Sequence, residues 1–264
     1  MRGAVAAAWQ FRYFVLSGIR GDLAIRFARS RLGMAWSILN PLAQSAIYVV
    51  VLSEVLSARL PNVASKSAYP IYLLAGMAAW SLFNEIVVRS ATIFIDYSAA
   101  LQKVAFPRLC LPLIVWGGAL INHAFLLLAL ALVAISLGHF QGLPWLYLPG
   151  GILLISVFAF GVGILAGIFN VFCRDVGQAL GIILQVWFWF TPIVYPIAAV
   201  PAGLRPLIEA NPLTPLVRAY QDALLWHAVP EAASLLRPLA LGVGLSLLAW
   251  LLFRRASSQL VDAL

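Results

Sequence analysis

Apolar and polar positions alternate along the chain in long blocks, with six apolar segments separated by shorter polar connections. An α-helix needs about 20 mostly apolar residues to cross a bilayer, and the segments approach or exceed that length. The expected transmembrane helices are Met34–Ser57, Tyr69–Val88, Leu109–Leu137, Trp145–Phe172, Leu180–Val200 and Pro238–Phe253. The last is short unless it begins near Ala232. The pattern predicts an all-α, polytopic membrane protein with about six transmembrane helices.

Two of the polar connections are themselves expected to fold. The stretch Trp9–Arg31 is rich in Arg and aromatic residues and repeats apolar positions at steps of four, which predicts a helix lying along the inner membrane surface. The loop Arg89–Arg108 is long enough for a second short helix parallel to the membrane, and Pro107 would end it.

The segment Pro201–Arg237 is too polar to span the bilayer and too apolar for a solvated loop. We expect two short re-entrant half-helices there, joined at Asn211-Pro212. Thr214 before Pro215 has the character of an N-cap for the second of them. Arg218 and Asp222 are four residues apart and can pair on its surface.

The distribution of basic residues sets the expected orientation. Twelve of the 17 Lys and Arg residues fall in 1–33, 89–108, 170–177 and 254–264, so these pieces and both termini are predicted to be cytoplasmic. A net charge of +8 is therefore explained by topology and anionic lipid, and nucleic-acid binding is not expected. Only 10% of residues are charged, against about 25% in soluble domains. Burying so apolar a chain requires membrane lipid.

Several kinds of chemistry have no counterpart in the sequence. Neither Lys66 nor Lys103 follows the glycine frame of a phosphate-binding loop, so ATP hydrolysis by that route is not expected. The three His and two Cys are scattered, which predicts neither a metal site nor a cofactor in this chain. Glu54 and Glu85 fall near the ends of predicted helices. This argues against an ion-coupled transporter, which usually carries an ionisable group at mid-membrane.

Five short elements carry a family resemblance when they are taken together in order and spacing. They are Ser30–Pro41, Asn170–Val176, Trp187–Pro196, Asn211–Leu213 and Arg218–Asp222. With them, the whole chain resembles the membrane subunits of ABC exporters for lipid-linked polysaccharides, the O-antigen and teichoic-acid export permeases. Capsule-export permeases are related, and the Asn40-Pro41 and Tyr195-Pro196 contexts look closer to the O-antigen branch.

The resemblance implies a permease without enzymatic activity of its own in the bacterial inner membrane. It implies a homodimer of this chain with two cytoplasmic ABC ATPase subunits, which would supply the ATP and Mg sites. The single permease domain, 1–264, would comprise a cytoplasmic interfacial helix (1–33), five spans (34–200), a periplasmic gate segment (201–237), and span six with a cytoplasmic tail (238–264).

The resemblance also assigns roles to two segments. The inner loop would contain a coupling helix that enters a groove on the ATPase, with contacts from Asp96, Gln102, Lys103, Phe106 and Arg108. The outer half-helices would form the periplasmic gate, with Asn211, Pro212, Arg218, Tyr220 and Asp222. On the residues alone, an ordinary positive-inside loop explains the first segment equally well.

Aromatic residues supply a physical argument for a sugar substrate. Sugars present apolar C–H faces, so a polymer can slide over aromatic rings that stack without holding any one sugar tightly. The candidate conduit residues are Trp187, Phe188, Trp189, Phe190 and Tyr195, together with Tyr48, Trp80 and Phe83. Consecutive aromatics point in different directions around a helix, so at most two or three of the first five can face one path. An aromatic belt at the outer interface is the alternative explanation.

Two sets of charged residues remain. Arg26, Arg29 and Arg31 are placed to meet the pyrophosphate of a lipid carrier at the inner face. Arg174 and Asp175, in the tight inner turn, are explained by an ion pair that links two helices. The alternatives to polysaccharide export are an ABC permease for capsule, teichoic acid or a small lipid or drug, and an ion-coupled secondary transporter. The sugar is not predicted.

Overall fold

A computed structural model of the chain describes residues 10–27, 31–49, 68–103, 106–107, 110–136, 138, 140 and 142–262. This part of the chain folds into helices and contains no strand, which confirms the all-α prediction. The elements are α2 (Arg12–Phe27), η1 (Gly33–Ala35), α3 (Trp36–Val49), α4 (Ala68–Asp96), α5 (Ser98–Lys103), α6 (Cys110–Ser136), η3 (Leu143–Tyr147), α7 (Leu148–Phe172), α8 (Asp175–Trp189), η4 (Ile197–Ala199), α9 (Arg205–Ala210), α10 (Leu213–Gln221), the π-helix η5 (Asp222–Trp226) and α11 (Ala232–Asp262).

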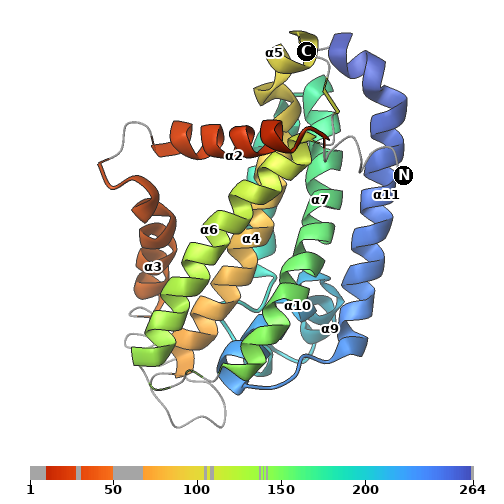
Figure 1. Cartoon of the computed structure of the whole chain (residues 1–264). Coiled ribbons are helices and arrows are strands. Elements are labelled where there is room, and N and C mark those ends of the chain that lie inside the picture. Colours follow the sequence, from red (N-terminus) through yellow and green to blue (C-terminus); the bar gives the residue numbers. More distant parts are fainter. Residues whose placement is uncertain are drawn as a thin grey trace.

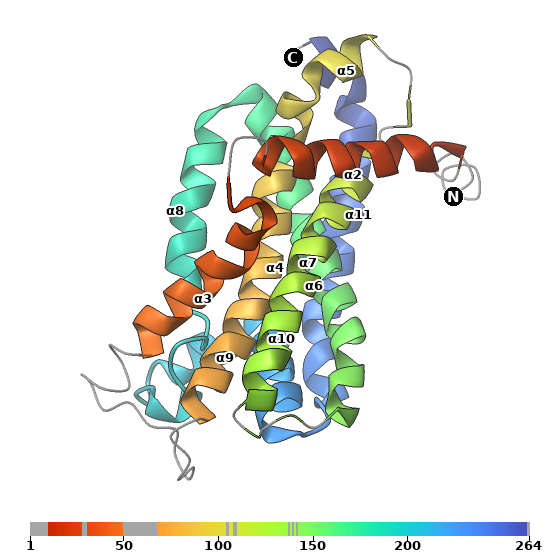
Figure 2. The ribbon, with the colours of Figure 1, turned by 60° about the vertical axis from the view of Figure 1, so that its left-hand side comes forward.

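Four helices in the described ranges are long and apolar enough to cross a membrane. They are α4, α6, η3 continued by α7, and the first 25 residues of α11. Figures 1 and 2 show them side by side in one bundle. The bounds of α6 and of η3–α7 agree with the predicted third and fourth spans. The sixth span begins at Ala232, the longer of the two predicted versions, and α4 continues past Val88 to Asp96.

Helix α7 packs between α4 and α11 (Figure 1). Glycines allow this close packing, as is common where transmembrane helices meet. At Gly163 an added Cβ would lie 2.7 Å from the Cβ of Ser90 on α4. At Gly161 it would lie 2.6 Å from the Cβ of Leu245 on α11. The most buried of the described helices is α4, which supplies the largest share of the core residues, and α7 packs directly against it.

Helices α3 and α8 are shorter. The described part of α3 ends at Val49, and the rest of the predicted first span lies outside the described residues. Helix α8 has 15 residues, about 22 Å at 1.5 Å per residue, and it ends at Trp189. The prediction that the fifth span continues to Val200 was wrong at that end. Pro192 and Pro196 lack the backbone N–H that a continued helix needs, and the chain turns there instead.

The two ends of the bundle differ. Helix α2 lies across one end, roughly perpendicular to the bundle, near α5 and the last turns of α11 (Figure 1). At the opposite end are α9 and α10, joined at Asn211-Pro212 as predicted (Figure 2). We call these the α2–α5 end and the α9–α10 end. The helix expected within Trp9–Arg31 and the short helix expected in the loop after Arg89 are both confirmed as helices.

Candidate functional site

The aromatic residues of α8 divide between the core and the surface. Phe188 is buried and meets Trp80 of α4 edge to face at 5.5 Å, while Trp187 is half-buried and meets Phe83 at 5.4 Å. Trp189 and Phe190 are exposed, at 52% and 45%. Of the eight conduit candidates, these two therefore present the largest described aromatic surface to the outside of the chain.

Trp80 and Phe83 belong to the bundle core within one chain. Phe83 has no exposed surface, and its ring stacks on Phe158 of α7 at 5.7 Å. These residues hold the α8 aromatics from behind rather than facing an opening of this chain. Tyr48 lies on α3, and its side chain is outside the described part of the structure. Whether any of the eight lines a conduit stays a prediction.

One face of α8 carries an apolar surface that no helix in the described part of the chain covers. Ile182, Ile183, Val186 and Phe190 border a hollow of about 540 Å³ that reaches Leu207 on α9. A second hollow of about 340 Å³ continues from it past Trp189 and Tyr195 toward η4 and α9. We call these four α8 residues together with Leu207 the α8 face. It offers apolar and aromatic contact and few groups that could hold a polar ligand firmly.

The turn that follows α8 is fixed by hydroxyl and amide groups of its neighbours. The Tyr69 hydroxyl donates to the carbonyl oxygen of Val194 at 2.8 Å. The Tyr72 hydroxyl lies 3.0 Å from the carbonyl oxygen of Pro192, which also accepts a hydrogen bond from the Gln221 side-chain amide at 3.1 Å. These bonds hold the backbone of residues 192–195 against α4 and α10, so Tyr195 and the end of α8 have a fixed direction.

Asn211 joins the end of α8 to the start of α10. Its Oδ1 accepts hydrogen bonds from the indole N–H of Trp187 at 2.9 Å and from the backbone N–H of Leu213 at 3.0 Å. Its Nδ2 donates to the Phe190 carbonyl oxygen at 3.1 Å and to the hydroxyl of Thr191 at 3.0 Å. Of the predicted gate residues, Asn211 thus makes the most contacts with the aromatic region.

Two details of the predicted gate were wrong. Thr214 is the second residue of α10 and does not cap it; its hydroxyl donates to the carbonyl oxygen of Ile208 at 2.6 Å. The sequence favoured Thr214 because Pro215 follows it, but the helix begins earlier. In the described structure Arg218 and Asp222 do not form an ion pair with each other. Both border a separate pocket.

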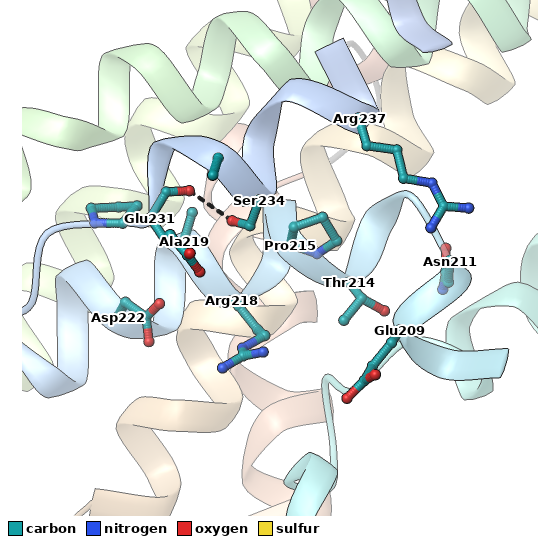
Figure 3. A pocket seen from close by; sticks show the side chains of 12 residues that line it. Glu209, Asn211, Thr214, Pro215, Arg218, Ala219, Asp222, Glu231, Ser234 and Arg237 are labelled. Atoms are coloured by element: carbon teal, nitrogen blue, oxygen red, sulfur yellow. Dashed lines mark hydrogen bonds between the residues drawn. The ribbon is translucent and has the colours of Figure 1, made fainter. Parts of the chain in front are cut away.

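That pocket lies between α10 and the beginning of α11 and holds about 340 Å³ (Figure 3). Acidic and basic side chains face it, namely Glu209 of α9, Arg218 of α10, Asp222 of η5, Glu231 just before α11 and Arg237 of α11. The Ser234 hydroxyl donates to the carbonyl oxygen of Glu231 at 2.7 Å, which fixes the first turn of α11. The pocket is the most highly charged part of the α9–α10 end among the described residues.

Tyr220, another predicted gate residue, is almost completely buried. Its hydroxyl lies 3.0 Å from Nε2 of His123 on α6, and the two rings meet edge to face. Beside it, Gly151 of α7 leaves room for the Tyr220 ring, since an added Cβ would lie 3.0 Å from it. Tyr220 therefore fixes α10 to the bundle, and Pro212 precedes the helix at the loop that Asn211 holds.

At the α2–α5 end the structure describes part of the predicted coupling set. Asp96 and Gln102 are exposed, and Asp96 accepts a hydrogen bond from Thr92. The ring of Phe106 packs on Phe14 of α2 at 4.8 Å. The side chain of Lys103 and the whole of Arg108 lie outside the described residues. The segment therefore reaches both solvent and α2.

The remaining basic candidates lie at the same end. Arg31 is exposed two residues before η1, while the side chain of Arg26 and all of Arg29 are outside the described structure. Arg174 and Asp175 are exposed at the turn between α7 and α8. Neither belongs to an ion pair within the described residues, so the predicted link between two helices is not formed by these charges.

Asn170 fastens that turn instead. Its Nδ2 donates to the carbonyl oxygen of Ala91 on α4 at 2.9 Å, and its Oδ1 accepts a hydrogen bond from the backbone N–H of Gly177 at 3.0 Å. Asp175, the first residue of α8, lies where the positive end of the helix dipole favours a carboxylate.

Sequence reasoning missed an ion-pair network near the α2–α5 end. Arg89 of α4 contacts Asp22 of α2 and Glu85 of its own helix. The signals available were the single acidic residue of an Arg-rich helix and an acid four residues before Arg89. No pattern along the chain connects Asp22 to Arg89, because 67 residues separate them. Within the described residues there is no group of three or more His, Cys, Asp or Glu side chains that could hold a metal ion.

Comparisons with known proteins point to transport. The sequence profile of the ABC-2 type transporter family matches residues 18–225. An O-antigen export system permease protein, RfbA of Myxococcus xanthus, is 26% identical over 262 residues, which covers 98% of each chain. The RfbA protein of Klebsiella pneumoniae is 28% identical over 77% of each chain. The polysialic acid transport protein KpsM of Escherichia coli is 24% identical over 81% of this chain and 82% of its own length.

Proposed function

This chain belongs to the ABC-2 type transporter family, and we propose that it is the permease of an ATP-driven exporter that moves a lipid-linked polysaccharide of the O-antigen class across the bacterial inner membrane. The observation that carries the substrate class is the similarity to an O-antigen export permease along 98% of both chains. The shorter match to a polysialic acid transport protein makes capsular polysaccharide the second candidate. Membership in an ABC transporter family argues against ion-coupled transport.

In the proposed exporter two copies of this chain enclose the path of the polymer. A path needs walls on every side, and one copy leaves the side chains of Ile183, Val186 and Phe190 exposed. A second copy that presents the same face would supply the opposite wall, because a two-fold axis places identical surfaces against each other. The α8 face supports this arrangement, since it is apolar, continuous and backed by a rigid core.

The chemistry of the same region suits a sugar polymer. Trp189, Phe190 and Tyr195 offer rings for stacking on the C–H faces of sugars, and the residues around them are mainly aliphatic. Such a surface makes weak contacts with each sugar and no strong ionic ones, so a chain can advance without being trapped. Asn211 and the clamped turn at 192–195 keep these rings in place while the polymer passes.

The α2–α5 end would face the cytoplasm, where most of the basic residues of the chain lie. Two separate ABC ATPase subunits, which hold the ATP and Mg, would dock there against α5 and the segment that follows it. The exposed side chain of Gln102 and the contact between Phe106 and α2 support this as the surface that receives ATPase movement. Both termini would then be cytoplasmic, and α9 and α10 would form the periplasmic gate.

The lipid-linked end of the polymer would enter beside α2. Arg31 is exposed at the junction of α2 and α3, where a cation can meet a pyrophosphate group at the membrane surface. Arg26 and Arg29 would contribute to the same cationic surface. Reversing the charge of these three residues should abolish export while the assembled complex and its basal ATPase activity persist. Loss of assembly would instead indicate a packing role.

The decisive experiment combines co-purification with transport. The tagged chain is extracted from its native membrane in detergent, and the eluate is tested for a partner with a phosphate-binding loop and for ATP hydrolysis. The complex is then reconstituted in vesicles and supplied with lipid-linked polysaccharide. We expect a stoichiometric ATPase, which is lost when Lys103–Arg108 are altered, and ATP-dependent uptake of the polymer. A chain that purifies alone and transports only with an ion gradient would refute the proposal.

A further inference from the structure

One guanidinium group holds three helices together at the α2–α5 end. Arg89 of α4 is only 12% exposed. Its Nη2 forms an ion pair with the carboxylate of Asp22 on α2, and its Nη1 lies 3.4 Å from Oε1 of Glu85 on α4. The same Nη1 donates to the carbonyl oxygen of Val115 on α6 at 3.3 Å. Arg suits this position because its planar fork presents several donors in fixed directions, which a Lys ammonium does not.

The acidic partners are satisfied as well. Glu85 accepts a further hydrogen bond from Nδ2 of Asn122 on α6 at 2.7 Å, so its carboxylate is held from two sides. Asp22 is 23% exposed and comes from a helix that otherwise carries basic charges. Ionisable groups at membrane depth are expensive and are retained where they have a partner and a purpose. This network is the main ionic link between α2 and the bundle among the described residues.

Glycine residues allow the helices around this ion-pair network to approach closely. Helix α2 crosses α6 at two glycines: Gly18 on α2 is covered by Ile114, and Gly117 on α6 is covered by Ile19. An added Cβ at either position would collide with the facing Ile side chain. At Gly118, an added Cβ would lie 2.5 Å from Nη1 of Arg89. The position of α2 is therefore set by close packing as well as by charge.

Helix α4 leads directly from Arg89 to the proposed ATPase contact. The backbone N–H of Tyr97 donates to the carbonyl oxygen of Ile93 at 3.1 Å, and the N–H of Leu101 donates to that of Tyr97 at 2.9 Å. These helical hydrogen bonds continue across the junction of α4 and α5. Burial raises the pKa of the Tyr97 phenol, and the charges of Asp22 and Arg89 also act on it. The turn of α4 that carries Arg89 is therefore joined to α5 by a backbone that stays hydrogen-bonded across the junction.

We propose that Arg89 is a positioning residue that makes α2 move together with α4 and α5. A displacement of α5 by the ATPase would then shift α2 at the site where the lipid-linked end enters. This inference rests on the proposed function and adds to it a mechanical link between two separate surfaces. The alternative is that the Asp22–Arg89 pair only stabilises the folded chain.

The test removes the carboxylate of Asp22 and leaves the other contacts of Arg89 in place. Asp22→Asn takes away the ion pair with α2 but leaves Arg89 paired with Glu85, so no isolated cation remains. Asp22→Glu keeps a carboxylate and serves as the conservative variant. Arg20→Gln removes an exposed charge from the same helix and serves as the matched control. Each full complex is reconstituted with its ATPase, and the polymer exported per ATP hydrolysed is measured beside basal hydrolysis.

If Arg89 couples the two surfaces, Asp22→Asn lowers export per ATP by about tenfold, whereas basal hydrolysis and assembly change by less than about twofold. Asp22→Glu restores more than about half of the export, and Arg20→Gln matches the unmodified complex. Hydrogen exchange of the α2 amides in the purified chain should also accelerate by about tenfold in Asp22→Asn alone, because the helix detaches more often.

Several results would overturn the inference, and they separate its failure from a failure of the proposed function. Faster exchange of α2 with unchanged export per ATP would show that the pair is structural only. Unchanged exchange would show that the pair does not hold α2 at all. An unmodified chain that neither binds an ATPase nor exports polymer would refute the proposed function and the coupling with it. A working unmodified complex that is insensitive to Asp22→Asn refutes the coupling alone.

Discussion

Helices α7 and α8 follow each other in the chain, yet α7 packs against many more neighbours than α8. Both are largely apolar, but α7 packs against α4 on one side and α11 on the other and leaves only some residues such as Phe169 exposed, whereas α8 leaves Ile182, Ile183 and Val186 exposed. The space around one glycine on each helix shows this difference in packing. Gly163 of α7 meets the backbone of α4, while an added Cβ at Gly181 of α8 would meet no atom within 4 Å. Apolar composition alone therefore does not tell whether a helix surface is packed against other helices of the same chain or left exposed.

The largest change in stability is expected when a bulky side chain is placed on α7 where it packs closely against α4. Gly163→Leu should lower the free energy of unfolding by about 3 kcal/mol, because its Cβ would lie 2.7 Å from that of Ser90 and neither helix backbone can move freely. The thermal unfolding midpoint of the purified chain measures this. Gly181→Leu is the matched variant on α8, and its change in stability should stay within about 0.5 kcal/mol. Equal destabilisation by both would contradict the comparison.

The next largest effect is expected at Asn211, which connects α8 to the enclosed part of the molecule. Asn211→Ala leaves the indole N–H of Trp187 and the first amide of α10 without their acceptor. Stability should fall by about 2 kcal/mol, since unsatisfied buried donors are costly. Asn211→Asp keeps the acceptor and should lose less. If both variants unfold like the unmodified chain, Asn211 does not hold the end of α8.

The next prediction concerns the proposed contact of the exposed α8 face with a second copy of the chain. Ile183→Trp should weaken self-association by about tenfold, because it overfills an interface of fixed shape and costs about 1–3 kcal/mol there. The mass of the protein in detergent or nanodiscs, measured against concentration, gives the constant. Leu247→Trp on the exposed face of α11 is the control and should leave the association unchanged. If Leu247→Trp weakened self-association and Ile183→Trp did not, the two copies would associate through α11 and not through α8.

The smallest effect is expected from single aromatic rings. Trp189→Ala should lower the rate of polymer export by about fivefold with no loss of stability, since one stacking surface contributes about 1 kcal/mol and Trp189 is 52% exposed. Trp189→Phe should retain most of the rate. Trp250→Ala removes an exposed ring from α11 and should have no effect. Transport that is unchanged in Trp189→Ala would indicate an interfacial belt instead of a conduit.

The fold was predictable where it depends on local sequence. The bounds of α6 and of η3–α7 follow from the lengths of their apolar segments, and the short half-helices follow from Asn211-Pro212. The end of α8 was missed because a count of apolar residues does not register that Pro192 stops the helix. The sequence favoured Thr214 as the residue that caps α10 because Pro215 follows it. It could not predict that Asn211 accepts a hydrogen bond from the indole of Trp187, because the two residues are 24 positions apart.

The site depends more on tertiary structure, and less of it was predictable. Composition identified the aromatic cluster, but Trp80 and Phe83 could not be assigned to the core without knowing which helix they face. The periodicity of the sequence likewise cannot predict the pairing of Asp22 with Arg89, because the two residues approach only when α2 packs on α6 next to α4. Residue types were therefore predictable, whereas their directions and distant partners were not.

The part of our proposal to test first is that the α8 face forms one wall of a path shared by two copies of this chain. Disulfide cross-linking in native membranes tests it directly, with Cys173, the exposed native cysteine, replaced by Ser. Ile183→Cys should give an oxidant-dependent band at about twice the mass of the 28.6 kDa chain, and Leu247→Cys should give none. Cross-linking through Leu247→Cys and not through Ile183→Cys would contradict the account.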